Sequence, residues 1–238
     1  MRLCPSPLPH PRTAVPAEAP APEEAGRPLR MAGRLVAAAI AVSFVALLVY
    51  GLLSKATNDS IDRGIRRSGS APAPAATLPV LERGSLGAVL SPRVGPALGG
   101  SRLSLSQLRG VPIVLNFWAS WCDPCRVEGP VLQRTWQRAR SAGVLFLGLN
   151  MQDITDDAHA FTRDLGISYP SIRDRSNGVA ERWGVTGLPE TFFISPNGRV
   201  VGHVIGAVSD RQLADGVAAA RAGGGLGVEG GGARRKTR

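Results

Sequence analysis

The sequence contains little cysteine and little histidine, with three residues of each among 238. Three cysteines are too few for the disulfide framework that stabilises many small secreted domains. A structural zinc site normally needs four ligands, and besides the pair Cys122 and Cys125 the central region has only His159 and His203. We therefore expect no bound metal and no resident cofactor.

The chain also lacks a concentrated basic surface, although its formal net charge is +10. Residues 1–77 carry a net charge of +4, residues 78–221 carry +3 and residues 222–238 carry +3. Inside 78–221 no dense run of Lys and Arg is interleaved with aromatic residues, as nucleic-acid binding usually requires. We expect no nucleic-acid partner.

One long segment, residues 35–53, has no charged side chain at all. As a helix, 19 residues span about 28 Å, close to the roughly 30 Å of a bilayer's hydrocarbon core. The segment therefore predicts a transmembrane signal anchor, with a cleaved signal peptide as the alternative. Three basic residues precede it within 15 positions and four follow it. Because these numbers are so similar, the positive-inside rule does not fix the orientation.

Composition divides the rest of the chain. Residues 1–34 are rich in Pro and Ala and predict a disordered tail, in which Cys4 is expected to be an inert thiol. Residues 54–77 end in a Pro/Ala-rich stretch and predict a flexible linker. Residues 222–238 are rich in Gly and basic residues and predict a second disordered tail. The remaining segment, 78–221, predicts one folded domain.

Within 78–221, strand and helix patterns alternate. Apolar runs predict buried strands over 111–119 and 144–149, and Pro196-Asn197-Gly198 predicts a hairpin turn between 191–195 and 199–205. Helical patterns cover 123–141, 155–165 and 209–221. We expect Thr155 to cap the second helix, and Val127 to share a buried face with Val131, Leu132 and Trp136 in the first. This order predicts an α/β domain with a central mixed sheet flanked by helices.

Cys122 and Cys125 lie where the first buried strand passes into a helix. Unpaired N–H groups and the positive end of the dipole at a helix N-terminus stabilise a thiolate. We therefore predict a redox-active disulfide, with Cys122 as the exposed nucleophile and Cys125 as the thiol that resolves a mixed disulfide. A purely structural disulfide over two intervening residues would close almost no loop and add little stability.

Two further features predict substrate contacts. Trp121 directly precedes the nucleophile, and an exposed ring there would hold a partner polypeptide; a core aromatic is the alternative, which we expect for Trp118. Leu188 and Pro189 follow a glycine turn and immediately precede a strand. In thioredoxin-like folds such a proline is cis and faces the dithiol, and the backbone before it binds substrate as an extended strand. An ordinary trans proline at a strand start is the alternative.

The stretches SLSQLRG, VLNFWASWCDPCRVEGP and GVTGLPETFFISPNGRV resemble the TlpA/ResA/CcmG (DsbE) group of membrane-anchored thioredoxins. The resemblance implies a thioredoxin-like fold with an inserted helical segment within 151–183. It also implies an extracytoplasmic protein-disulfide oxidoreductase, tethered to the cell membrane by a single span, that reduces the heme-binding cysteines of apocytochrome c. A membrane thiol–disulfide protein would supply its electrons.

Asn116 stands where general thioredoxins carry a buried Asp that accepts the proton of the resolving thiol. An amide cannot do this near neutral pH, so another base is needed. Glu128 lies three residues after Cys125, on the same helix face, and the resemblance implies a functional Glu at this position. A partly buried Glu128 would have a raised pKa suited to this exchange, whereas a solvated surface Glu is the alternative.

Other functions remain open from the residues alone. The chain could instead be an extracytoplasmic oxidant that forms disulfides, because the negative charge of Asp123 beside Cys122 is too weak to set the direction of electron flow. It could also be a copper-binding thiol chaperone, since two soft thiolates suit Cu(I), although no Met or His cluster accompanies them. Nothing specifically marks a peroxide-reducing site.

Overall fold

A computed structural model describes residues 27–54 and 58–231, which belong to two separate units divided after Ala56. In the first unit the described residues form one helix, α1 (Arg27–Ser54), with Pro28 in its first turn, where a missing N–H costs nothing. Its stretch Gly33–Gly51 is exposed and is long and apolar enough to cross a membrane. The predicted tail over 1–34 is therefore wrong from Arg27 onward, and residues 1–26 lie outside the described residues.

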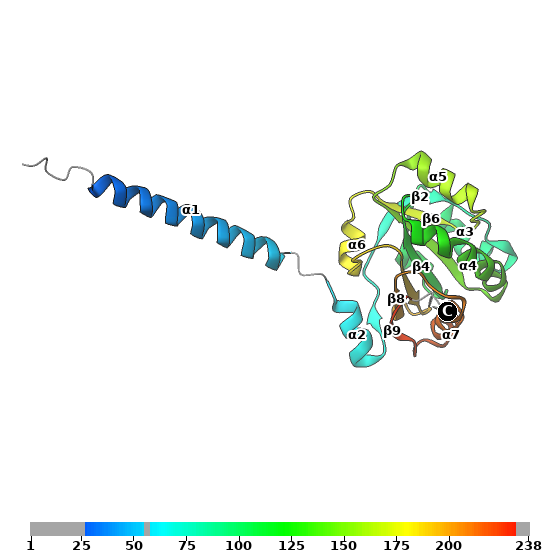
Figure 1. The fold of residues 1–238 in the computed structure, drawn as a ribbon. Coiled ribbons are helices and arrows are strands. Elements are labelled where there is room, and N and C mark those ends of the chain that lie inside the picture. The colour runs from blue at the N-terminus through cyan, green and yellow to red at the C-terminus, as the bar shows by residue number, and fades with distance from the viewer. Residues whose placement is uncertain (1–26, 55–57, 232–238) are drawn as a thin grey trace, which may run out of the picture. The chain divides into compact units, whose positions relative to one another are not determined.

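The second unit is built on a mixed nine-stranded sheet (Figure 1). Its strand order is β1-β8-β7-β4-β5-β6-β2-β3, with β9 paired to β8. The pairs β4–β5 and β5–β6 are parallel, whereas β7 runs antiparallel to β4. The strands are β1 (Ala71–Pro72), β2 (Thr77–Glu82), β3 (Arg102–Ser104), β4 (Ile113–Trp118), β5 (Leu145–Met151), β6 (Ser171–Asp174), β7 (Glu190–Ile194), β8 (Arg199–Ile205) and β9 (Gly227–Gly230).

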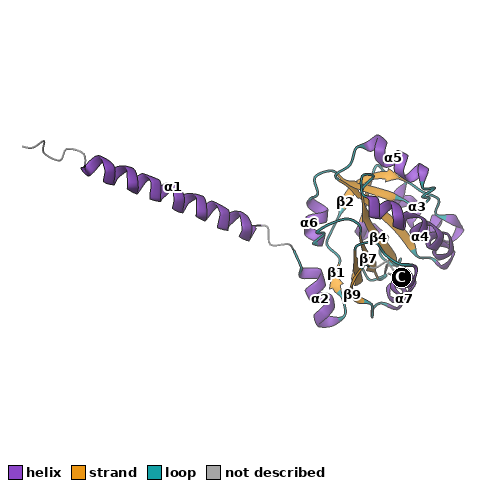
Figure 2. Ribbon diagram, viewed as in Figure 1, coloured by secondary structure: helices purple, strands orange, loops and turns teal. Residues whose placement is uncertain are grey.

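Helices surround this sheet, as the purple and orange ribbons of Figure 2 show. They are α2 (Ser60–Ser68), α3 (Gly87–Leu98), α4 (Asp123–Ala139), α5 (Thr155–Asp164), α6 (Gly178–Trp183) and α7 (Asp210–Ala222). The predicted α/β class with a central mixed sheet is confirmed. Between β5 and β7 the chain adds α5, β6 and α6, so the segment expected to be a helical insertion also contributes a strand.

Strand β4 lies at the centre of the sheet, between β5 and β7, and all six of its residues are buried. This explains its continuous apolar run, because a strand covered on both faces needs no polar side. The strand ends at Trp118, and the chain then turns into α4. The dithiol therefore follows a central strand that is fully buried.

Two local predictions about helices are wrong. The residue that caps α5 is Ile154 rather than Thr155, because the helix starts at Thr155 itself. Val127 is 70% exposed, and the buried face of α4 instead includes Cys125, Glu128 and Leu132. The apolar pattern is misleading at Val127, because the next residue along the helix, the polar Glu128, takes the inward position.

The predicted flexible linker over 54–77 is wrong in its described part. Residues 60–68 form α2, which places Ile61 and Ile65, one helical turn apart, against the hydrophobic core with 3% exposure each. The helix ends at Gly69, whose φ of 74° suits the left-handed conformation of a helix C-terminus. Burying each of these two apolar side chains stabilises the fold by about 1.5–3 kcal/mol, and the segment therefore folds despite its polar composition.

The predicted tail over 222–238 is also wrong in part. Helix α7 extends to Ala222, and Gly227–Gly230 pairs with β8 as a parallel strand. Leu226 occupies the space that Gly202 leaves free, since a Cβ on Gly202 would lie 2.5 Å from a Leu226 methyl carbon. The sequence did not predict this strand, because its pairing depends on main-chain groups and a glycine-rich segment shows no side-chain pattern. Residues 232–238 lie outside the described residues.

The packing of α7 on the sheet leads to a stability prediction. A Cβ on Gly216 would lie 2.2 Å from the buried ring of Phe193. Although alanine favours a helix over glycine, Gly216→Ala should therefore lower the free energy of unfolding by about 1–3 kcal/mol, measured by urea denaturation. Gly95→Ala in α3 is the matched control, because its Cβ would make only an ordinary 3.8 Å contact with Leu86. Equal stability of both variants would contradict this packing.

Candidate active site

The two cysteines of the C-x-x-C segment form a disulfide in this structure, with an S–S distance of 2.05 Å. Cys122 is the N-cap residue of α4, and its Sγ accepts a hydrogen bond from the backbone N–H of Cys125 at 3.2 Å. Pro124 lies in the first turn of the helix. In the reduced protein the same N–H and the helix dipole would stabilise a thiolate at Cys122.

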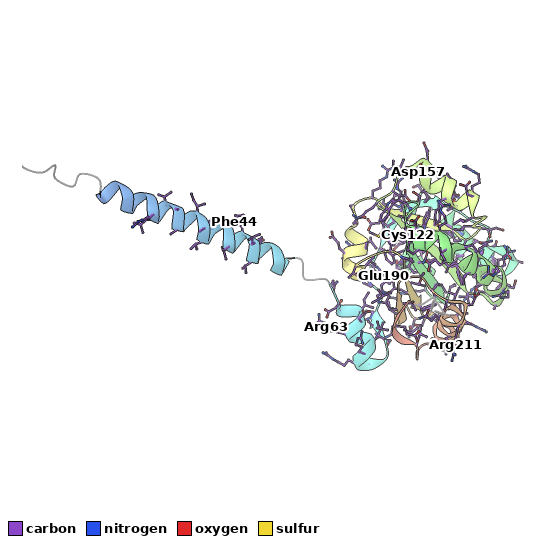
Figure 3. The ribbon with its side chains drawn as sticks, in the orientation of Figure 1. Phe44, Arg63, Cys122, Asp157, Glu190 and Arg211 are labelled. Atoms are coloured by element: carbon purple, nitrogen blue, oxygen red, sulfur yellow. A yellow bond between two sulfur atoms is a disulfide. The ribbon has the colours of Figure 1, made fainter. Side chains whose placement is uncertain are left out.

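Cys122 is less accessible than the sequence suggested. Its exposed fraction is 4% and that of Cys125 is 2%, so the oxidised Cys122 is not the exposed group we expected. Both sulfurs belong to a small apolar cluster that includes Trp118 and Phe161, whose rings stack at 4.8 Å, with Leu188 packed against it. Figure 3 labels Cys122 on the second unit. A partner must therefore approach closely at the residues that border the disulfide.

Glu128 is buried beneath the dithiol helix with 2% exposure. One carboxylate oxygen accepts a hydrogen bond from Asn116 Nδ2 at 2.8 Å, and the other accepts one from the backbone N–H of Val208 at 2.8 Å. Asn116 Nδ2 also donates to Thr191 Oγ1 at 3.0 Å. Burial raises the pKa of Glu128 to about 7, although both hydrogen bonds oppose that shift. A carboxyl group that titrates near neutral pH can both accept and donate a proton.

The structure holds the loop before the dithiol through a residue that sequence reasoning missed. Asp153 follows β5, and its carboxylate accepts hydrogen bonds from the Ser120 N–H and hydroxyl, both at 2.6 Å. Asn150 Nδ2 also donates to it, at 2.7 Å. Because β4 and β5 are parallel neighbours, Ser120 and Asp153 emerge at the same edge of the sheet. The sequence signal for this contact was that Ser120 and Asp153 each come shortly after a buried strand.

Two of the predicted substrate-contact residues, Trp121 and Leu188, line one surface pocket. Trp121 is 58% exposed, and its indole N–H donates to the Gln152 carbonyl oxygen at 2.7 Å. Leu188 lines the same pocket, together with Thr186 and Gly187. Trp118 is a core residue, as expected.

Pro189 lies directly before β7, and the Leu188–Pro189 peptide bond is cis, as we expected. In the sheet register, the next residue, Glu190, pairs with Phe117 of β4. Since β4 leads into the dithiol loop, Pro189 lies at the sheet edge where that loop begins. The structure thus places Leu188, which directly precedes Pro189, against the apolar cluster that contains both sulfurs.

Glu190 is a second buried acid that sequence reasoning did not identify. It is 1% exposed, and one of its oxygens accepts hydrogen bonds from the backbone N–H groups of Thr186 and Gly187, at 2.9 and 3.1 Å. The other oxygen lies 3.0 Å from His203 Nε2. Glu190 therefore fixes the loop that lines the pocket.

Comparison with known proteins agrees with this geometry. A family model described as the AhpC/TSA family matches residues 72–203, more than half of the chain. The chain is 34% identical over 116 residues to the thiol-disulfide oxidoreductase ResA of Bacillus subtilis, covering 49% of this chain and 65% of that protein. It is 38% identical over 98 residues to the thiol:disulfide interchange protein HelX of Rhodobacter capsulatus, covering 41% and 53%. The chain thus spans less than two thirds of either relative.

A solved structure shares the fold. The chain is similar to a Chlorobium tepidum protein described as a thiol:disulfide interchange protein DsbE, with a TM-score of 0.52 and 25% sequence identity. The match covers 63% of this chain and 96% of that one. This likeness confirms the thioredoxin-like fold.

Proposed function

Because the chain belongs to the AhpC/TSA family and, as a thioredoxin-like thiol–disulfide oxidoreductase, to the TlpA/ResA/CcmG group, we propose that it reduces the heme-binding cysteines of apocytochrome c. The observation that carries this proposal is the Cys122–Cys125 disulfide at the N-terminus of α4, with the buried acid Glu128 one turn further along. A pair placed in this way can exchange electrons with another dithiol through a mixed disulfide.

The proposed reaction starts from the reduced pair. The Cys122 thiolate attacks a disulfide sulfur of the substrate, which forms a mixed disulfide and releases one substrate cysteine as a thiol after it takes up a proton. Cys125 then attacks the Cys122 sulfur, and Glu128 accepts the proton that Cys125 loses. The second substrate cysteine leaves as a thiolate and becomes a thiol when it takes up a proton, which balances the proton that Glu128 accepted. Two electrons pass to the substrate, and the Cys122–Cys125 disulfide is formed.

The pocket beside the disulfide supports binding of an extended polypeptide. Trp121 offers an exposed aromatic face, and the backbone of Thr186–Leu188 lies next to Pro189. A substrate strand placed along this loop would bring its cysteine to Cys122. Trp121, Leu188 and Pro189 are therefore proposed as the substrate-binding residues.

Helix α1 supports a cellular location for this reaction. The helix is long and apolar enough to cross a membrane once. We propose that it anchors the chain in the cell membrane with the second unit on the extracytoplasmic side, where exported thiol proteins such as apocytochrome c would be its partners. Each cycle leaves Cys122 and Cys125 joined as a disulfide, so a membrane thiol–disulfide protein would supply two electrons to reduce the pair again.

The reduction potential of the full chain in detergent tests this function. Thioredoxin-like proteins range from about −270 mV for reductants to about −120 mV for strong oxidants. We expect a value at the low end, together with reduction of a peptide that contains an oxidised Cys-x-x-Cys-His segment. A value near −120 mV with oxidation of the reduced peptide would instead identify a disulfide-forming oxidant. Tight Cu(I) binding without exchange would identify a copper chaperone.

A further inference from the structure

A row of hydrogen-bonded side chains, of which His203 and Glu190 are buried and Asp62 is partly exposed, connects helix α2 with the loop that precedes β7. Asp62 Oδ1 of α2 lies 2.8 Å from His203 Nδ1, and the other ring nitrogen, Nε2, lies 3.0 Å from Glu190 Oε2. The second oxygen of Glu190 accepts the N–H groups of Thr186 and Gly187. One imidazole ring therefore joins the helix that follows the membrane segment to the loop beside the disulfide.

The geometry of this row requires a specific protonation state. Each ring nitrogen of His203 lies within hydrogen-bond distance of a carboxylate oxygen, and a carboxylate can only accept. A neutral imidazole has a single N–H, so only the imidazolium satisfies both carboxylates. Burial favours the neutral ring, but the hydrogen bonds to Asp62 and Glu190 outweigh it, and the pKa of His203 is raised.

Other charged groups near His203 are engaged elsewhere. Asp59 lines a small pocket together with Asp62 and His203, but it forms an ion pair with Arg63 at 2.7 Å. Glu229 on the neighbouring strand β9 accepts a hydrogen bond from Gln212 Nε2 at 3.1 Å. The ring face of His203 stacks on Phe192, with 3.9 Å between centroids. Among the described residues, Asp62 and Glu190 are therefore the carboxylates that hydrogen-bond to His203.

A second contact ties the same parts together. Asn58, just before α2, donates its side-chain N–H to the Arg182 carbonyl oxygen at 2.8 Å. Its own carbonyl oxygen occupies the place where a side chain of Gly184 would begin, only 1.9 Å from an added Cβ. Gly184 has a φ of 75°, in the left-handed region that favours glycine. It lies two residues before Thr186, where the loop begins. The start of α2 thus packs directly against the approach to the loop.

We propose that His203 is a positioning residue for disulfide exchange, which holds the Thr186–Gly187 loop in its substrate-binding conformation by bridging Asp62 of α2 and Glu190 of β7. The ring touches neither cysteine, so its effect falls on polypeptide binding. As pH rises through the titration of His203, the ring loses one N–H and one carboxylate loses its partner. Glu190 or Asp62 is then less firmly held, and peptide substrates bind more weakly.

This inference rests on the proposed exchange of disulfides with a polypeptide, but not on the identity of that polypeptide. The test compares the full chain in detergent with His203→Gln and Asp62→Asn. Each protein reacts with a cyclic disulfide peptide and with 5,5′-dithiobis(2-nitrobenzoate), which is too small to need the loop. Both reagents are disulfides that oxidise the reduced chain, and Cys122 attacks both of them, so the ratio of the two rates cancels the titration of the dithiol.

We expect His203→Gln to lower this ratio about tenfold, through KM for the peptide, and to abolish its pH dependence. Asp62→Asn keeps a hydrogen-bond acceptor for the ring but removes one charge, so the midpoint of the pH dependence should fall by roughly one unit. His159→Gln is the matched control, since His159 also contacts a carboxylate, that of Glu82 at 2.6 Å, but at the surface.

A wild-type ratio and midpoint in Asp62→Asn would overturn the proposal, even if His203→Gln failed to fold. A change confined to thermal stability in both variants would also overturn it. If the wild-type chain exchanged disulfides with generic peptides but not with the heme-binding segment, the proposed substrate would be wrong and the role of His203 would stand.

Discussion

Replacing Cys122 by serine should abolish exchange with a disulfide peptide, with a loss of at least about three orders of magnitude in rate. The reason is chemical, because a serine hydroxyl does not ionise near neutral pH, whereas the Cys125 N–H and the helix dipole would stabilise a thiolate at Cys122 in the reduced protein. Stopped-flow measurement of peptide reduction by the full chain checks this result.

Replacing Cys125 should have a different outcome. Cys122 can still attack, but no second thiol displaces the substrate, so Cys125→Ser should accumulate a mixed disulfide that non-reducing electrophoresis and mass spectrometry detect. Capture of a cytochrome polypeptide from cells would support the proposed client. Cys4→Ser is the matched control, since Cys4 lies outside the described residues and is expected to be inert. Trapping through Cys125, or undiminished exchange in Cys122→Ser, would reverse the assignment of roles.

Replacing Glu128 by glutamine should slow the second step about 100-fold while leaving the first attack nearly unchanged. Cys125 is buried and must lose its proton to displace the substrate, and Glu128 lies one turn along the same face of α4. The mixed disulfide should therefore accumulate transiently in Glu128→Gln. Rapid acid quenching followed by mass spectrometry measures both steps. Glu82→Gln is the control, because the Glu82 side chain is partly exposed and hydrogen-bonds to His159.

The raised pKa of Glu128 also makes the free energy of unfolding depend on pH. The pKa of Glu128 in the folded, oxidised protein is about 7, against an ordinary value of 4.5. Because the folded value is the higher one, its stabilising contribution is complete below pH 4.5 and is lost as pH rises through 7, by about 3 kcal/mol in total. Urea denaturation across this range should show a loss that is about 3 kcal/mol larger in the wild type than in Glu128→Gln. If the free energy of unfolding depended on pH equally in both proteins and the second step of exchange were unchanged, Glu128 would have no role in the mechanism.

Much of this site could be read from the sequence. The C-x-x-C pair, the apolar strand before it and the proline before β7 are local patterns, so their residue types and spacing were sufficient to predict a dithiol at a helix start. Asn116 in place of an acid was equally visible, and it directed attention to Glu128. The two ends of the folded unit were not predicted, since short apolar contacts such as Ile61 and Ile65 are easily hidden in polar or glycine-rich segments.

What the sequence by itself determined was the chemistry, because a thiol pair at a strand–helix junction has its reactivity set by its immediate neighbours. Tertiary structure decided which distant side chains support that pair. Asp153 meets Ser120 only because β4 and β5 are parallel neighbours, and Asp62 meets His203 only because α2 packs on the sheet. Their partners lie 33 and 141 residues away, and no local pattern specifies which charges a folded chain brings into hydrogen-bond distance.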